Sequence, residues 1–160
     1  MKKITFLLFV LVIFMTSCSA KNEQPKKVTE SLVGYMVIED NKIYLDRVEI
    51  ITAEDTDRIK ELGLSKQADM PSGYYIYNPV KEKEEYELTN ETTYSFVDMT
   101  LLFVKNKDGD RSYTTTKKEE FLQYLNSTYT DTPPAQKVPF FIQVKDGKVV
   151  SITEKFGFTI

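Results

Sequence analysis

The sequence contains no histidine and no tryptophan, and Cys18 is its single cysteine. Without histidine the chain has no Ser-His-Asp triad, no imidazole general base and no histidine-ligated metal site. A lone cysteine has no partner in the chain for a disulfide and makes no set of thiolates for zinc. Any chemistry must therefore come from carboxylates, hydroxyls, lysines, arginines and the 10 tyrosines, and we expect neither a cofactor nor a metal.

Acidic residues outnumber basic residues, which bears on the partners of the protein. The 160-residue chain has 21 lysines and arginines against 24 aspartates and glutamates, a formal net charge of −3. Proteins that bind DNA or RNA neutralise phosphates with a basic surface, so this balance argues against a nucleic-acid partner. It argues equally against broad electrostatic adhesion to anionic lipid headgroups.

Residues 1–17 have the organisation of a secretory signal peptide. Two lysines precede the apolar segment 4–15, which is too short for a membrane span of roughly 20 residues. The segment Met15-Thr16-Ser17-Cys18 then resembles the lipobox of bacterial lipoproteins, with methionine where leucine is commoner. The resemblance implies a diacylglycerol thioether on Cys18 and cleavage that makes Cys18 the first residue of the mature protein.

The mature chain is predicted to consist of an anchor, a tether and one domain. Two acyl chains hold a protein stably on a bilayer, since each buried CH₂ contributes about 0.8 kcal/mol. Residues 18–30 are polar and lack apolar periodicity, so we expect a lipidated, flexible tether. Residues 31–160 are numerous enough for a single globular domain with its own core.

Short strands separated by turns are predicted for much of this domain. Alternating apolar residues flank Asp40-Asn41 and Asp146-Gly147, and this pattern predicts two hairpins, over 31–51 and 140–152. Three further strands are predicted over 74–77, 86–89 and 92–104, the last of them long or broken near Asp98.

Two helices are predicted from their end signals. The first covers 52–62, with a capping box at Thr52 and a left-handed C-terminal residue at Gly63. The second follows a capping box at Thr116. Its inward-facing residues are expected to be Phe121, Leu122 and Leu125. The fold class is therefore α+β, most simply a small, strongly bent antiparallel β-sheet or an OB-like barrel with two short helices.

The segment Gly73–Pro79 places three tyrosines in one short strand. Tyrosines present large, rigid, amphipathic surfaces, so Tyr74, Tyr75 and Tyr77 are candidate ligand-binding residues. Tyrosine also suits a half-buried strand in which its hydroxyl reaches a backbone partner, so core packing is the other interpretation. The sequence leaves both open.

Acidic residues between Asp46 and Asp69 suggest a different chemistry. Two carboxyl groups across a cleft hydrolyse a glycoside when one of them has a raised pKa. The candidates for such a pair are Asp46, Glu49, Asp69 and Asp98. Other acids in this region are explained by the predicted first helical turn, where the helix dipole stabilises negative charge. The oxygen-rich segment Asn106–Asp110 lacks the spacing of a calcium loop, so we interpret it as a turn.

Four segments carry a family resemblance. They are Leu45–Glu49, Asp57–Gly63, Gly73–Pro79 and the hairpin around Asp146-Gly147. Together they resemble a group of small lipoproteins of Gram-positive bacteria without an assigned function. The resemblance implies lipidation and a single domain, and it implies no functional residues.

The sequence thus predicts a lipoprotein held on the extracytoplasmic face of the cell membrane through the lipid on Cys18. We expect a binding or accessory module of the cell envelope, with an envelope protein or a small molecule as its ligand, rather than an enzyme. The alternative is a carboxylate-dependent hydrolase that acts on envelope glycans. The identity of the ligand and the oligomeric state are left open.

Overall fold

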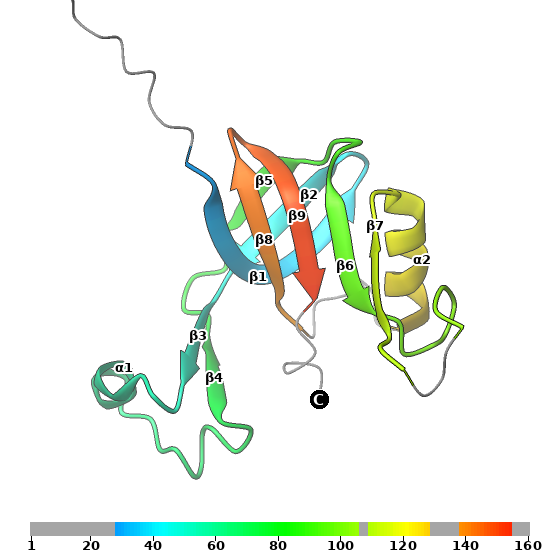
Figure 1. Cartoon of the computed structure of the whole chain (residues 1–160). Helices are drawn as coiled ribbons and strands as arrows, with labels where there is room; N and C mark the ends of the chain where they lie inside the picture. The colour runs from blue at the N-terminus through cyan, green and yellow to red at the C-terminus, as the bar shows by residue number, and fades with distance from the viewer. Residues whose placement is uncertain (1–27, 106–108, 129–137, 155–160) are drawn as a thin grey trace, which may run out of the picture.

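The computed structural model describes residues 28–105, 109–128 and 138–154, which form two sheets and two helices (Figure 1). The chain is α+β, as predicted. Cys18 and the predicted signal peptide lie outside the described residues. Among the residues that are described, no helix is long and apolar enough to cross a membrane.

Seven strands form the main sheet, in the order β5-β2-β1-β8-β9-β6-β7. They are β1 (Glu30–Glu39), β2 (Lys42–Arg47), β5 (Lys83–Glu87), β6 (Thr93–Val97), β7 (Ser112–Thr115), β8 (Phe140–Lys145) and β9 (Lys148–Glu154). A bridge between Glu87 and Lys148 also joins β5 to β9. Five strands, β5, β2, β1, β8 and β9, therefore close a ring of hydrogen bonds, and β6 and β7 extend the sheet beyond β9.

The main sheet is mixed, whereas the sequence predicted an antiparallel sheet. The two predicted hairpin pairs, β1–β2 and β8–β9, are antiparallel. However, β9 runs parallel to β6 and, at one position, to β5. Parallel neighbours need a long connection, and β7, a helix and β8 separate β6 from β9. Turn signals, which are local, do not reveal such a pairing.

The turns of both hairpins agree with their sequences. Asp146 and Gly147 have φ angles of 52° and 75°, as a two-residue turn with left-handed backbone requires. Asp40 at the β1–β2 turn has a φ of 52°. Within β1, Gly34 meets β2 so closely that an added Cβ would lie 2.3 Å from the backbone carbonyl oxygen of Asp46. The absence of a side chain at Gly34 permits this approach.

The smaller sheet belongs to a second unit that projects from one end of the main sheet (Figure 1). This small unit, residues 49–77, comprises β3 (Glu49–Thr52), α1 (Thr56–Glu61) and β4 (Tyr74–Tyr77). Its apolar cluster consists of Ile51, Ile59 and Met70, against which Leu62, Leu64, Tyr75 and Tyr77 pack. A two-stranded sheet is marginally stable alone, so this cluster supplies the packing that the small unit needs.

Of the two end signals predicted for α1, the structure confirms the C-terminal one and shortens the helix at its N-terminus. The helix is shorter than predicted because Thr52 belongs to β3, and the Asp55 carboxylate accepts hydrogen bonds from the Thr52 amide and hydroxyl at 2.7 and 2.8 Å. The C-terminal signal is confirmed: Gly63 has a φ of 65°, and the Leu64 amide donates to the Ile59 carbonyl at 2.9 Å.

The main core lies between the inner face of the main sheet and α2 (Lys118–Thr128). Phe96 of β6 stacks on Tyr124 of α2 with ring centroids 4.0 Å apart, and Tyr94 stacks on Phe121 at 4.8 Å. The buried face of α2 is Phe121, Tyr124 and Leu125. Leu122 was wrongly predicted to face inward and is half-buried. Each residue turns the helix by about 100°, so Leu122 lies roughly a quarter-turn from Phe121, at the edge of the buried face rather than at its centre.

Candidate functional site

A polar pocket lies on the outer face of the main sheet. Strand alternation buries Met36, Ile43 and Leu45 in the core, and it turns Tyr35 and Val37 of β1, with Tyr44 and Asp46 of β2, to the other side. The register places Tyr35 opposite Asp46 and Val37 opposite Tyr44. Lys83 of β5 follows in the same row, opposite Asp46.

The chain that leaves the small unit completes this pocket. Asn78 follows β4 directly, and its side-chain Nδ2 donates a hydrogen bond to Asp46 Oδ2 at 3.2 Å. Lys81 comes from the same connection to β5. The pocket has a volume of about 380 Å³. Its lining residues are Tyr35, Val37, Tyr44, Asp46, Asn78, Lys81 and Lys83.

Two oxygens in this pocket are buried without a hydrogen-bond partner among the described residues. They are Oδ1 of Asp46 and Oδ1 of Asn78. A buried acceptor without a donor costs about 1–3 kcal/mol, so native proteins rarely keep one without a reason. The two side chains that carry them are joined by the hydrogen bond from Asn78 Nδ2 to Asp46 Oδ2, so we call the two unpaired oxygens an acceptor pair, which suits a ligand with N–H or O–H groups.

Tyr35 adds a neutral hydroxyl to the pocket. Burial raises the pKa of Tyr35, and the nearby Asp46 and Tyr74 raise it further. The phenol therefore stays protonated at neutral pH and is available as a donor. Tyr74 of β4 contributes to this electrostatic effect but is not part of the pocket lining.

None of the three tyrosines that the sequence singled out, Tyr74, Tyr75 and Tyr77, is part of the lining of this pocket. Tyr75 and Tyr77 are half-buried and pack against its apolar cluster. The Arg58 guanidinium also lies over the Tyr77 ring, 5.3 Å from its centroid. Sequence reasoning missed Tyr35 and Tyr44, which lie in the predicted hairpin 31–51 on either side of its turn and had no signal beyond their place in those strands.

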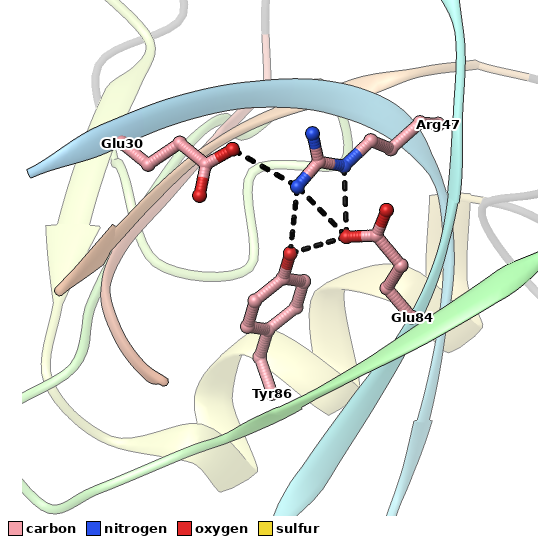
Figure 2. Close-up of polar contacts among 4 residues, drawn as sticks. All are labelled: Glu30, Arg47, Glu84 and Tyr86. Carbon is pink, nitrogen blue, oxygen red and sulfur yellow. Dashed lines mark hydrogen bonds and ion pairs between the residues drawn. The ribbon is translucent and has the colours of Figure 1, made fainter. Parts of the chain in front are cut away.

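Arg47, the last residue of β2, forms a cluster of polar contacts with Glu30, Glu84 and Tyr86 (Figure 2). Arg47 Nη2 donates to Glu30 at 3.0 Å and to the Tyr86 hydroxyl at 2.9 Å, and its Nε donates to Glu84 at 2.8 Å. The Tyr86 hydroxyl in turn donates to Glu84. Burial acts to lower the pKa of Arg47, but these partners outweigh it and raise the pKa. The cluster is mutually satisfied, so its role is to hold β1, β2 and β5 together.

The other candidate carboxylates have structural partners. Asp98, which directly follows β6, accepts backbone N–H groups of Leu102, Phe103 and Val104 at 3.0, 2.7 and 2.8 Å. Burial opposes the charge of Asp98, but these hydrogen bonds outweigh it and lower its pKa. This loop ends the predicted strand 92–104 at Val97, and the unpredicted β7 follows it.

Glu49 and Asp69 belong to the small unit and also have partners. Glu49 accepts two hydrogen bonds from Arg58, at 2.8 and 2.6 Å, and Arg58 lowers its pKa. Asp69 accepts the backbone N–H of Ser65 at 2.7 Å. Of the four acids predicted for a hydrolytic pair, only Asp46 lines the pocket on the outer face.

Two further hollows lack the acceptor pair. One of about 660 Å³ lies between residues 89–91 and the β8–β9 hairpin, and one of about 320 Å³ lies beside Arg47 and Tyr77. Within the described ranges, none of their lining residues has a buried side-chain oxygen or nitrogen without a partner. The same part of the chain contains no group of three or more histidine, cysteine or acidic residues that could hold a metal ion.

Comparison with known proteins returned no relative: no family model, no curated protein and no solved structure matches this chain.

Proposed function

We propose that this protein is a lipoprotein, anchored through Cys18 on the extracytoplasmic face of the cell membrane, that serves as a binding or accessory module of the envelope. The pocket on the outer face of β1 and β2 is its ligand site in this proposal. The observation that carries the binding function is the pair of buried, unpartnered acceptors, Asp46 Oδ1 and Asn78 Oδ1.

The fold supports a binding role. The hydrogen-bonded ring of β5, β2, β1, β8 and β9 is consistent with the OB-like interpretation, a class of small barrels whose outer strands and loops bind ligands. Five of the seven lining residues lie on strands of this ring, and sites built on strands hold their side chains more precisely than sites on loops. A tether of the expected length reaches at most roughly 40 Å when extended, which lets the site meet ligands near the membrane.

Catalysis by paired carboxylates is less well supported. A glycan hydrolase needs a second carboxyl group across the cleft from the first, and one of the two must have a raised pKa. Asp46 is the single acid in the lining of this pocket. Among the described residues, each carboxyl group whose pKa shifts clearly has a lowered one: Glu49, Asp55, Asp98, Asp110 and Glu120.

The anchor is tested by metabolic labelling with an alkyne fatty acid, followed by separation of membrane and soluble fractions. We expect the wild-type chain to be labelled and to sediment with membranes, and the Cys18→Ala variant to lose both properties. A labelled or membrane-bound Cys18→Ala variant would contradict lipidation at this residue.

The binding function is tested with the lipidated protein in detergent micelles. Its thermal unfolding is followed with soluble fragments from enzymatic digests of cell envelopes, for the wild type and for Asp46→Asn. Asp57→Asn is the matched control, because Asp57 is exposed on α1 and is not part of the pocket lining. We expect a fraction that stabilises the wild type and the control but not Asp46→Asn. If every fraction leaves the wild type unchanged, or acts equally on all three proteins, the pocket is not the ligand site.

A further inference from the structure

The charged groups of the pocket are arranged for a ligand that carries both signs of charge. Asp46 is half-buried, with its partly unpaired carboxylate beside Asn78, whereas Lys81 and Lys83 are exposed. Lys83 is directly opposite Asp46 in the β2–β5 register. Even so, no ion pair joins Asp46 to either lysine, and neither lysine forms an ion pair with any other described residue. The pocket therefore offers an acceptor pair and two cations that do not neutralise one another.

Simpler ligands leave part of this arrangement unused. A metal or an organic cation would satisfy the acceptor pair but would be repelled by the two lysines. An anion such as phosphate would bind the lysines but has no donor for Asp46 and Asn78. An uncharged sugar would supply donors to the acceptors and leave the lysine charges without a counter-charge. A molecule with an ammonium group and a carboxylate satisfies all of them, since hydrogen bonds between charged groups are the stronger kind.

The size and the walls of the pocket fit a small molecule of this kind. Its volume of about 380 Å³ is at the lower end of the range for small-molecule sites, roughly 300–1,000 Å³. Tyr35, Val37 and Tyr44 supply an aromatic and apolar wall beside the charged groups. Such a wall can bury a side chain while the polar groups orient the charged end.

We infer that the pocket binds an α-amino acid as a zwitterion. The ammonium group donates to Asp46 and Asn78, the carboxylate lies against Lys81 and Lys83, and the side chain packs against Tyr35 and Tyr44. The two acceptor oxygens are buried, so this binding mode requires the side chains that cover them to shift when the ammonium enters. This inference rests on the proposed binding function and specifies its ligand class.

The experiment is isothermal titration of the lipidated protein in detergent micelles. The probes are the L- and D-forms of alanine, leucine, phenylalanine and glutamate, with the methyl ester and the N-acetyl derivative of each. We expect at least one free amino acid to bind. Each of its two derivatives should bind with an affinity at least about tenfold lower, because each lacks one of the two charges.

Two variants assign the charges to residues. Asp46→Asn is expected to lower the affinity for the free amino acid by about tenfold or more. Lys83→Met is expected to lower the affinity for the free amino acid to a similar degree. It should leave the affinity for the methyl ester unchanged, since the ester lacks the carboxylate that the lysine recognises. Asp57→Asn and Lys60→Met are matched controls on the exposed side of α1, and both should bind as the wild type does.

The possible outcomes separate this inference from the proposed function. Equal binding of the amino acid, its ester and its N-acetyl derivative would overturn the zwitterion. Binding of an uncharged envelope fragment with the same dependence on Asp46 would also overturn the zwitterion. That result would still support the proposed binding function. If neither the amino acids nor any envelope fragment binds, both proposals are wrong.

Discussion

Asn78 donates a hydrogen bond to Asp46 across 32 positions of the sequence, and this contact joins the end of β4 to the outer face of β2. It therefore ties the small unit to the main sheet at the same place where the two unpartnered oxygens lie. An arrangement that leaves buried acceptors unpaired lowers stability, and such sites persist where function requires them. The four predictions below concern this contact, the packing of the small unit, the loop after β6 and the pairing of β1 with β2.

Removing the acceptor pair is predicted to separate stability from binding. In the double variant Asp46→Val with Asn78→Val, both unpaired oxygens are replaced by apolar groups, so the free energy of unfolding should stay unchanged or rise by about 1 kcal/mol. The single variant Asp46→Val leaves the Asn78 amide without its acceptor and should be less stable than the double variant. Urea unfolding gives both values, and titration of the ligand should show no binding. A double variant less stable than either single variant would show that the pair stabilises the fold.

Two tyrosine substitutions distinguish the pocket from the small unit. Tyr75→Ser removes a ring that packs on the cluster of Ile51, Ile59 and Met70 and should cost about 2 kcal/mol. Tyr44→Ser changes the pocket wall and should leave stability nearly unchanged while it weakens binding. Hydrogen exchange over residues 49–77 should accelerate for Tyr75→Ser alone. If Tyr75→Ser instead weakened binding and left stability unchanged, the ligand would bind at the strand of Tyr74, Tyr75 and Tyr77.

The Asp98 carboxylate is predicted to make the loop after β6 sensitive to pH. Its pKa is lowered in the folded protein, so its contribution to stability is present above about pH 4, the ordinary pKa of aspartate, and is lost as the pH falls through the lowered pKa. Asp98→Asn should cost about 2 kcal/mol at pH 7, because a neutral amide replaces a charged acceptor of three N–H groups. The difference from the wild type should shrink as the pH is lowered from 6 toward 2. Asp57→Asn, at an exposed position, is the control, and a difference that is constant with pH would contradict the prediction.

Gly34 is predicted to be essential for the β1–β2 pairing. In Gly34→Ala the new Cβ would lie 2.3 Å from the Asp46 carbonyl oxygen and 2.8 Å from Leu45 Cδ1, so β1 and β2 must move apart. We expect a loss of about 3 kcal/mol, together with weaker ligand binding because Asp46 shifts. Ser31→Ala, at an exposed position of the same strand, should have little effect on chemical denaturation. A Gly34→Ala protein with wild-type stability would show that the strands separate at little cost.

Local signals explain the parts of the fold that the sequence predicted. The Asp146-Gly147 turn and the Gly63 helix end depend on left-handed backbone at single positions, which few residues adopt easily. The α+β class follows from such elements taken together. The division of the predicted hairpin 31–51 into β2 and β3 was not predicted, because the chain continues in an extended conformation from one sheet to the other.

The pairing of distant segments explains what was missed. β7 and the parallel β6–β9 pair depend on partners that lie far apart in the chain. The candidate site has the same origin, since β1, β2, β5 and the segment after β4 each contribute to its lining. Asp46 was predicted as an acid of possible chemical importance, but its partner Asn78 had no signal beyond a turn before Pro79.

The sequence alone determined the lack of histidine and of a second cysteine, the turns and the general class of the fold, and it carries the prediction of a lipid anchor at Cys18. These features depend on residue identity and on neighbours a few positions away. Only the tertiary structure decided that Tyr35 and Tyr44 line the pocket while Tyr75 and Tyr77 pack in the small unit. That outcome depends on which face of each strand is buried by distant partners, and alternation alone defines two faces without saying which of them meets the core.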